Sequence, residues 1–364
     1  MKLGMLLFML IPIVGHIYVF WHVWNIVPLH NWLKIVLLTL LSLGFVALVF
    51  SFGVGLNKVP MPLATCVYEF GTSSVFVLLY AVMLFLLLDM GRLVHLVPKH
   101  FIHNSLLGTL TILGILLSVF VYGNIHYNNK ERQELHLNTS KHLDKPLKVV
   151  MISDLHLGYH NRRAEFARWV DLINAERPDL VLIAGDIIDI SVRPLLEENV
   201  AEEFRRIKVP IYACLGNHEY YSGDANAEKF YRDANINLLR DSVVQVMDLN
   251  LVGRDDRTNG RRASLKTLMG KVDPSKYTIL LDHQPYHLEE AQRAGVDFQL
   301  SGHTHYGQVW PISWIEDAIY EDAYGPLTKG NTRYYVTSGI GIWGGKFRIG
   351  TRSEYVVATI TKSF

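Results

Sequence analysis

The chain has 364 residues, enough for two domains of ordinary size, and 50% of them are hydrophobic, more than one soluble core requires. The formal net charge is +1, and no basic run with interleaved aromatic residues occurs, so nucleic acid is excluded as an expected partner. Two cysteines, Cys66 and Cys214, do not form a disulfide framework. The surplus of apolar residues predicts contact with lipid.

The apolar surplus lies in the first third of the chain. Residues 1–123 hold only five of the 35 Lys and Arg and two of the 34 Asp and Glu. Four stretches there approach or exceed the length of about 20 apolar residues that crosses a bilayer. They are residues 3–24, 35–56, 73–97 and 104–122. The sequence therefore predicts an all-α transmembrane region of about four helices, the first uncleaved because it lacks a small-residue cleavage site.

The flanks of these stretches predict an orientation. With the N-terminus inside, the cytoplasmic flanks carry more Lys and Arg than the outer ones, which predicts a multi-pass membrane protein with its soluble domain in the cytoplasm. Asp89 and Arg92 are three residues apart and are expected to pair on one helix face. Residues 124–146 are polar and aperiodic, which predicts a linker or a first edge segment before a domain at 147–364.

Short β-prone runs alternate with helical patterns beyond the linker. The runs are residues 147–153, 179–184, 211–215, 277–281 and 298–300, and residues 164–176 show helical spacing of apolar side chains. This alternation predicts an α/β fold. In an open α/β sheet, ligands bind outside the carboxyl ends of the strands, so side chains following these runs are expected to converge.

Each predicted strand is followed by side chains that bind metals. These side chains are Asp154, His156, Asp186, Asn217, His218, His283, His303 and His305. Residues two apart on an extended segment point to one side, so Asp154 and His156 can bind one ion. Any one of them alone would be interpreted as a helix cap, a turn residue or a core histidine. Five successive strand ends with such side chains predict a metal centre, and the preceding Gly185, Gly216 and Gly302 predict turns without room for a side chain.

These residues also resemble a known family. Asp154-x-His156, Gly185-Asp186-x-x-Asp189, Gly216-Asn217-His218-Glu219, His283 and Gly302-His303-x-His305 resemble, in order, the five blocks of calcineurin-like metallophosphoesterases. The resemblance covers about residues 148–360, and residues 153–158 and 301–308 look like the membrane-anchored subgroup of bacteria and animals. It implies a sandwich of β-sheets flanked by helices, preceded here by the transmembrane region.

The resemblance also implies a role for each residue. Asp154, His156 and His305 would hold a first metal, Asn217, His283 and His303 a second, and Asp186 would bridge both. His218 would stay off the metals and act on the substrate. Two cations about 3.5–4 Å apart lower the pKa of a shared water and clamp phosphoryl oxygens. An imidazole-rich set suits Mn, Fe or Zn better than Mg or Ca.

Three features leave alternatives open. Glu219 and Asp189 either orient neighbouring groups or are a cap and a surface charge. Residues 309–324, rich in Trp, Ile and Tyr, form a lid, a membrane-interface segment or, the interpretation we favour, a core-packing insertion. Tyr306 stands where the subgroup usually has Gly, so the substrate pocket around Tyr306, Arg254 and Trp310 is open as well.

The predicted function is a metal-dependent phosphoesterase that hydrolyses a phosphodiester or pyrophosphate, lipid-linked or close to the membrane. The resemblance implies either a nucleotide-linked lipid pyrophosphate or a headgroup phosphomonoester as substrate. The alternative is a membrane receptor or transporter whose metal domain binds a ligand without turnover. No protein partner can be inferred from the sequence.

Overall fold

The computed structural model describes residues 3–363, with side chains described from residue 11 onward. The described chain divides into two compact units. The first comprises Met1–Ile125 with Gly344–Lys346, and the second comprises His126–Trp343 with Phe347–Phe364. The main division lies close to the boundary predicted after residue 123.

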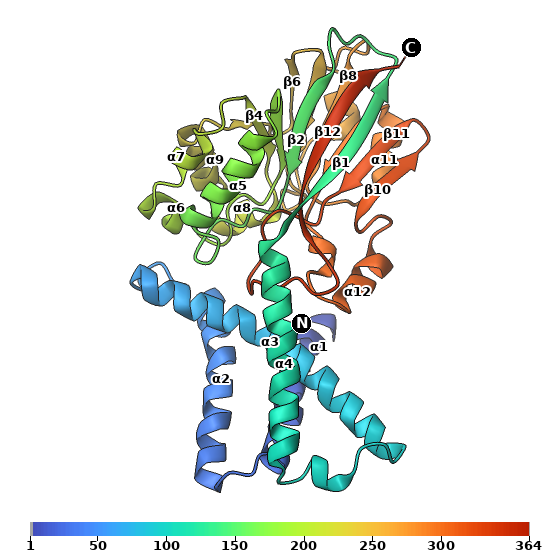
Figure 1. Ribbon diagram of the computed structural model, residues 1–364. Helices are drawn as coiled ribbons and strands as arrows, with labels where there is room; N and C mark the ends of the chain where they lie inside the picture. The colour runs from blue at the N-terminus through green and yellow to red at the C-terminus, as the bar shows by residue number, and fades with distance from the viewer. Residues whose placement is uncertain (1–2, 364) are drawn as a thin grey trace. The chain divides into compact units, whose positions relative to one another are not determined.

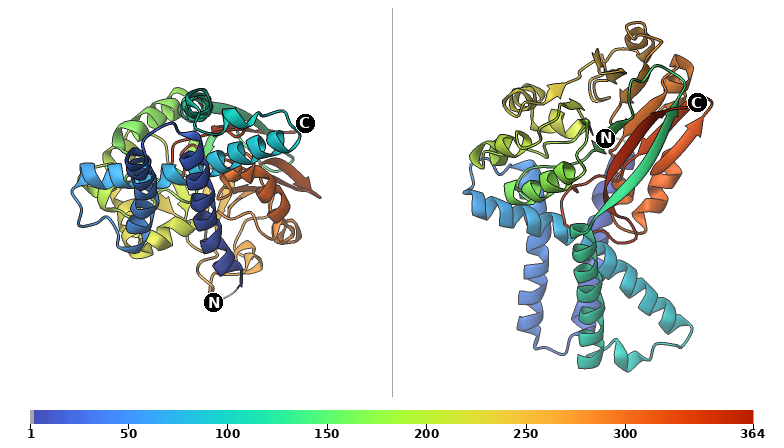
Figure 2. Two further views of the ribbon diagram at one scale, coloured as in Figure 1. Left: turned by 90° about the horizontal axis from the view of Figure 1, so that it is seen from below. Right: turned by 45° about the horizontal axis from the view of Figure 1, so that its top comes forward.

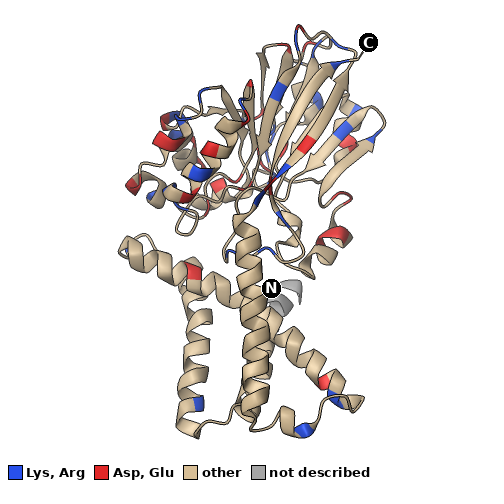
Figure 3. Cartoon of the chain, in the orientation of Figure 1, with Lys and Arg blue, Asp and Glu red and all other residues tan. Residues whose placement is uncertain are grey.

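The first unit is helical. It contains α1 (Leu3–Ile26), α2 (Asn31–Gly53), α3 (Met61–Leu93), the short 3-10 helix η1 (Lys99–Phe101) and most of α4 (Leu106–Asn128) (Figure 1). Within the described residues, three helices are long and apolar enough to cross a membrane, namely α2, α3 and α4. The first predicted span coincides with α1, but it lies partly outside the residues whose side chains are described. Charged residues are sparse on these helices (Figure 3).

Two predictions for this unit need correction. Helix α3 begins at Met61, well before the predicted start at residue 73, because helical backbone continues beyond the most apolar part of the pattern. The expected ion pair between Asp89 and Arg92 is wrong for the described side chains. The Asp89 carboxylate instead accepts a hydrogen bond from the Tyr18 hydroxyl at 2.7 Å and lies 3.0 Å from His22 Nε2. A carboxylate in an apolar helix bundle is stabilised by partners inside the bundle, and those partners come from α1.

The second unit contains two mixed β-sheets of six strands each. The first sheet has the order β1 (Lys130–Thr139), β12 (Ser353–Lys362), β2 (Leu147–Ile152), β3 (Leu180–Ala184), β4 (Ile211–Cys214), β5 (Asn237–Leu238). The second has the order β10 (Gly325–Lys329), β11 (Thr332–Val336), β9 (Phe298–Ser301), β8 (Tyr277–Leu281), β7 (Leu249–Gly253), β6 (Ser242–Val246). Strands β2 to β5 are parallel, and so are β7, β8, β9 and β11. The carboxyl ends of the parallel strands within each sheet therefore lie at one edge.

Alternation of side chains along the strands builds three apolar layers. In β2, Val149 and Met151 belong to the core between the sheets, whereas Val150 and Ile152 face the helices. Helices α5 (Arg163–Ala175), α7 (Ala201–Phe204) and α9 (Asp224–Asp233) cover the outer face of the first sheet, and α10 (Leu265–Met269) and α11 (Leu288–Ala294) cover that of the second. Each fully buried Val, Leu, Ile or Met side chain contributes about 1.5–3 kcal/mol.

The predicted elements of this unit are confirmed with small shifts at their ends. The five predicted strands are β2, β3, β4, β8 and β9, and the predicted helix is α5. The sequence left open a linker or a first edge segment at residues 124–146, and the structure shows an edge segment, because these residues contain the end of α4 and the whole of β1. Strand β1 lies at the sheet edge beside β12, side by side in both views of the sheet (Figures 1 and 2), so it exposes polar side chains and lacks the apolar run of an inner strand.

Candidate metal centre

Five strands deliver the predicted ligands to one place. Strands β2, β3 and β4 of the first sheet and β8 and β9 of the second each end just before one or more of them. The structure brings six of them into two groups, in each of which the ligand atoms lie within 4.8 Å of one another. The groups are Asp154, His156 and His305, and Asp186, His283 and His303.

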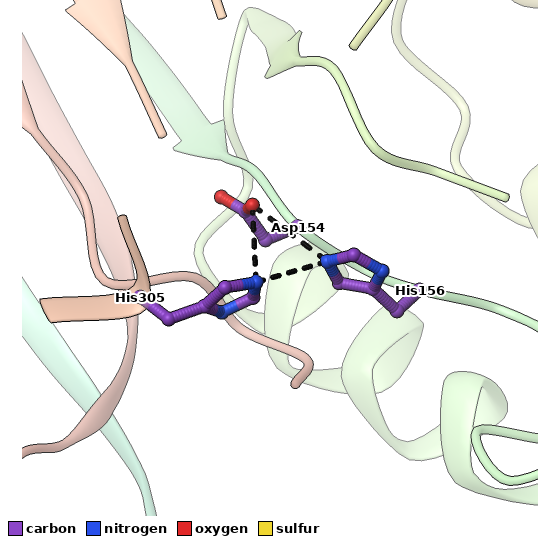
Figure 4. A group of neighbouring side chains, drawn as sticks. All are labelled: Asp154, His156 and His305. Atoms are coloured by element: carbon purple, nitrogen blue, oxygen red, sulfur yellow. Dashed lines mark hydrogen bonds and ion pairs between the residues drawn. The ribbon is translucent and has the colours of Figure 1, made fainter. Parts of the chain in front are cut away.

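The first group has two imidazoles facing each other beside a carboxylate (Figure 4). Nε2 of His156 lies 3.0 Å from Nε2 of His305. Asp154 Oδ1 lies 3.4 Å from the His305 nitrogen and 3.8 Å from the His156 nitrogen. Two facing imidazole nitrogens and a carboxylate oxygen can share a cation through their lone pairs, which is the donor set of a transition-metal site.

The second group is joined to the first by Asp186. Its Oδ2 atom lies 3.1 Å from His283 Nε2 and 3.7 Å from His156 Nε2, so this carboxylate stands between the two groups. The His283 Nδ1–H donates to the Ala184 carbonyl at 2.6 Å, which turns Nε2 toward Asp186. Asn217, at the start of α8 (Asn217–Ser222), has a buried Oδ1 that accepts no hydrogen bond from the residues that the structure describes. Such a buried acceptor without a donor fits a metal ligand.

The charges in this region also fit cations. Among the described residues, the ion-pair partners of the buried Asp154 and Asp186 are histidines. Burial acts to lower the pKa of His156, but the nearby carboxylates of Asp154 and Asp189 raise it to about 10. Burial acts to raise the pKa of Asp154, but His305 and His156 hold it below its ordinary value. The carboxylates therefore stabilise positive charge between them, which divalent metal ions supply when bound.

His218 lies beside these groups and is oriented by Asp189. Its Nδ1 atom is 3.1 Å from Asp189 Oδ1, and its backbone N–H donates to Asp186 Oδ1 at 2.9 Å. The same Asp189 oxygen is 3.3 Å from Nδ1 of His156. Because Asp189 is fully buried between the two rings, the alternative that it is a surface charge is wrong.

Glu219 holds the turns that carry the ligands. Its buried carboxylate accepts hydrogen bonds from the backbone N–H groups of Gly216 at 2.7 Å, Ile188 at 2.9 Å and Asp186 at 3.1 Å. The residue thus closes the α8 N-terminus and ties it to the turn after β3. For Glu219 both interpretations left open by the sequence hold, because it caps α8 and also orients the turn after β3, whereas Asp189 orients neighbouring groups.

The ligand backbones have an unusual conformation. Five of the predicted ligands have positive φ angles: Asp154 at 55°, His156 at 44°, Asp186 at 52°, His303 at 74° and His305 at 49°. L-residues adopt this region rarely and at a cost of about 1–3 kcal/mol each, and such residues cluster at functional sites. A Cβ on Gly216 would lie 2.2 Å from Asp186 Oδ1, and one on Gly302 would lie 2.0 Å from Ser153 Oγ. The interpretation of these two glycines as steric necessities is confirmed.

One supporting residue, Arg348, has no signal in the sequence. Its fully buried guanidinium donates from Nη1 to the His305 carbonyl at 2.6 Å and from Nη2 to the Ser338 and Gly341 carbonyls. Burial lowers its pKa to about 10, so the side chain is still charged at neutral pH. Ile340 in the same loop donates to the Ser153 carbonyl at 3.2 Å. Arg348 therefore connects the two segments that carry Asp154 and His305, which are distant in sequence.

The segment 309–324 contains α12 (Ile312–Ile319), and its apolar side chains face outward. Trp314 is 65% exposed, Ile315 56% and Ile319 56%, so the core-packing interpretation is wrong for this helix. Residues of its C-terminal part lie near the site. The hydroxyl of Tyr306, in η2 (His305–Gly307), lies 3.3 Å from Asp317, and the ring of Tyr320 lies 6.3 Å from that of His303.

Comparison with known proteins places this fold and site in a family. The model of the calcineurin-like phosphoesterase family matches residues 147–307. An uncharacterized metallophosphoesterase of Campylobacter jejuni is 30% identical over 255 residues, which cover 68% of each chain. An uncharacterized metallophosphoesterase of Helicobacter pylori is 31% identical and the match covers 58% of this chain and 59% of that one. A "transmembrane protein with metallophosphoesterase domain" of Danio rerio is 31% identical, with 57% and 52% covered, so the match spans only about half of that relative.

The chain belongs to the calcineurin-like phosphoesterase family. It is accordingly a metal-dependent hydrolase of phosphate esters, and its family uses a dinuclear metal site. The family resemblance and the predicted fold class are confirmed.

Proposed function

We propose that the site holds two divalent cations, Mn, Fe or Zn, one on Asp154, His156 and His305 and the other on Asn217, His283 and His303. Asp186 is the bridge, and its place between the two groups of donors carries this assignment. When bound, such a pair of cations activates a water molecule and neutralises the phosphoryl oxygens. The chain itself holds the donors rigidly through Glu219 and Arg348, which limits reorganisation during the reaction.

His218 protonates the leaving-group oxygen. Its Nδ1 atom faces the Asp189 carboxylate, so Nε2 is the nitrogen available to hold a proton toward the substrate. Imidazole suits this role because its ordinary pKa is near neutrality. The proton leaves with the alcohol or phosphate group that is expelled, and the phosphate ester bond is replaced by a bond to the water oxygen.

The substrate is a phosphodiester or pyrophosphate that is lipid-linked or close to the membrane. Helix α12 supports this choice, because Trp314, Ile315 and Ile319 form an exposed apolar face. This face lies next to Tyr320, whose ring is close to that of the candidate ligand His303. Amphipathic segments with exposed Trp and Ile insert into the membrane interface. The three apolar helices of the first unit keep the same chain in a bilayer, with the metal domain in the cytoplasm.

Loss of the bridge tests the assignment. Purified full-length protein reconstituted with Mn is expected to hydrolyse bis(p-nitrophenyl) phosphate, and Asp186→Ala and His218→Ala are expected to abolish turnover. Only Asp186→Ala should also lower the bound metal, measured by elemental analysis. Hydrolysis that survives Asp186→Ala contradicts the proposal. Binding of phosphate esters without any hydrolysis by the wild-type protein would favour the receptor or transporter alternative.

A second experiment tests the lipid-linked substrate. In nanodiscs, Trp314→Glu is expected to reduce kcat/KM for a lipid phosphate at least fivefold, roughly 1 kcal/mol of lost interfacial binding, and to change hydrolysis of a soluble ester less than twofold. Leu196→Glu on α6 (Arg193–Glu197) is the matched control, because Leu196 is 55% exposed and lies away from α12 in sequence. Equal effects of Trp314→Glu on both substrates would contradict a role at the membrane.

A further inference from the structure

The loop of residues 254–262 follows β7 and is held rigidly against the metal domain. The buried Asp255 accepts hydrogen bonds from the Tyr220 hydroxyl at 2.7 Å, Asn259 Nδ2 at 2.8 Å and Arg240 Nε at 2.9 Å. The neighbouring Asp256 accepts two hydrogen bonds from the amide of Gln284, which follows the ligand His283. The loop is thereby tied both to α8 and to the segment that carries a metal ligand.

Two arginines of this loop are neutralised by acids. Arg254 Nη1 lies 2.8 Å from Glu290 and 3.3 Å from the buried Asp282, and Arg262 Nη1 lies 2.9 Å from the other Asp282 oxygen. Arg254 is itself buried. Arg254 thus pairs with acids of the protein itself. Its contacts do not support the expectation from the sequence that it shapes the substrate pocket.

Arg257 differs from both. In the described part of the chain it forms no ion pair, and its Nη1 atom is buried without a hydrogen-bond partner. Its guanidinium lies over the ring of Tyr286, 4.1 Å from the centroid. A buried donor without an acceptor is unfavourable, and this cost disappears when a ligand supplies the acceptor. The residue as a whole is only partly buried, so a ligand that approaches the Tyr286 ring can reach the guanidinium.

Two tyrosines connect this arginine with the metal centre. The Tyr286 ring lies 4.7 Å from the ring of Tyr320, and the two hydroxyl groups are 3.0 Å apart. Tyr320 in turn lies 6.3 Å from the ring of His303. The rings of Tyr286 and Tyr320 therefore lie between Arg257 and the candidate metal ligand His303. The Nη1 N–H groups of the stacked guanidinium have no hydrogen-bond acceptor among the described residues.

We propose that Arg257, held on the Tyr286 ring, binds a second anionic group of the substrate beside the phosphate that the metal centre hydrolyses. The planar guanidinium binds phosphate oxygens through two parallel N–H groups while it remains stacked on an aromatic ring. The substrate class is thus a phosphate ester with a second phosphate, as in a diphosphate. This inference rests on the proposed function and selects among its possible substrates.

Binding measurements test this without requiring turnover. The dissociation constants of methylphosphonate, methylenediphosphonate and propane-1,3-diphosphonate are measured by calorimetry on Mn-loaded full-length protein in detergent. Arg257→Ala is expected to raise the ratio of diphosphonate to monophosphonate dissociation constants about tenfold for at least one diphosphonate, because bidentate contacts to a phosphate are lost. Arg257→Lys should give an intermediate ratio, since a lysine keeps the charge but not the two-pronged geometry.

Arg261→Ala is the matched control, because Arg261 is an exposed arginine of the same loop. It removes the same charge and should leave the ratio within about twofold, as screening weakens exposed charges. An unchanged ratio in Arg257→Ala for both diphosphonates, or an equal change in Arg261→Ala, would overturn the proposal. A wild-type protein that binds the diphosphonates through Arg257 but hydrolyses nothing would refute the proposed function and leave this subsite standing.

Discussion

Two clusters of histidine and carboxylate in this chain differ in burial. Asp154, His156 and His305 are almost completely enclosed, whereas His142 and Asp144 are 59% and 76% exposed at the side chain beside Asp248. Ligand atoms lie equally close together in both clusters, within 4.8 Å. Distance between donors therefore does not distinguish a metal centre from a surface ion pair.

Burial makes the difference because of solvation. Water and salt screen the exposed carboxylates, so that cluster is stable without a cation. The enclosed carboxylates have lost their water, and hydrogen bonds together with positive charge nearby compensate them. The enclosed cluster is also held in place by contacts of three further buried residues, Glu219, Asp189 and Arg348. Substitutions in each cluster and in the residues that support it test this contrast.

The largest effect is expected from His156→Ala. This residue faces His305 and also approaches Asp186, so its loss removes a donor next to both groups. We expect kcat/KM for bis(p-nitrophenyl) phosphate to fall about a thousandfold, the upper range for loss of one preorganised electrostatic group. Metal content, measured by elemental analysis, should fall as well. Full metal content with full activity would contradict the assignment.

Arg348→Met should destabilise the metal domain. The change leaves the carbonyls of His305, Ser338 and Gly341 without their buried donor. We expect the free energy of unfolding to fall by about 3 kcal/mol, measured by denaturant titration of the full-length protein in detergent. Arg352→Met is the control, because the ion pair of Arg352 with Glu131 is partly exposed. A comparable loss in both variants would show that Arg348 has no special role.

Glu219→Gln should have a smaller effect that is specific to the site. Glutamine keeps one acceptor oxygen but replaces the other with an NH₂ donor, which faces backbone N–H groups of Gly216, Asp186 or Ile188. We expect metal affinity, measured by chelator competition, to fall about tenfold, the lower range for residues that support metal ligands. Unchanged affinity would mean that the α8 turn holds its shape without this carboxylate.

His142→Ala should have almost no effect. The exposed cluster is expected to contribute less than about 0.5 kcal/mol to stability, as is usual for surface ion pairs. Activity should stay within about twofold and metal content should not change, because screened charges do not require a cation. A loss of bound metal equal to that of His156→Ala would refute the distinction by burial.

Local patterns account for what the sequence predicted well. The five strands were predicted because short β-prone apolar runs are a local property of the sequence, as with β3 (Leu180–Ala184), which is followed by Gly185. The candidate ligands were predicted because they directly follow those strands. The contacts that the sequence did not predict all join distant segments, as with Arg348 and His305, Arg257 and Tyr286, and Asp89 and His22.

The amino-acid sequence alone predicted the apolar helices, the α/β domain that follows them, the order of the strands that end at the site, and the candidate ligands. Periodicity and spacing carry that information because side-chain direction repeats every few residues. Three features are visible only in the folded chain: which carboxylates are enclosed, which arginines pair with acids, and the exposure of Trp314 on α12. Solvation and pairing depend on neighbours brought from elsewhere in the chain, and packing of the two sheets brings them together.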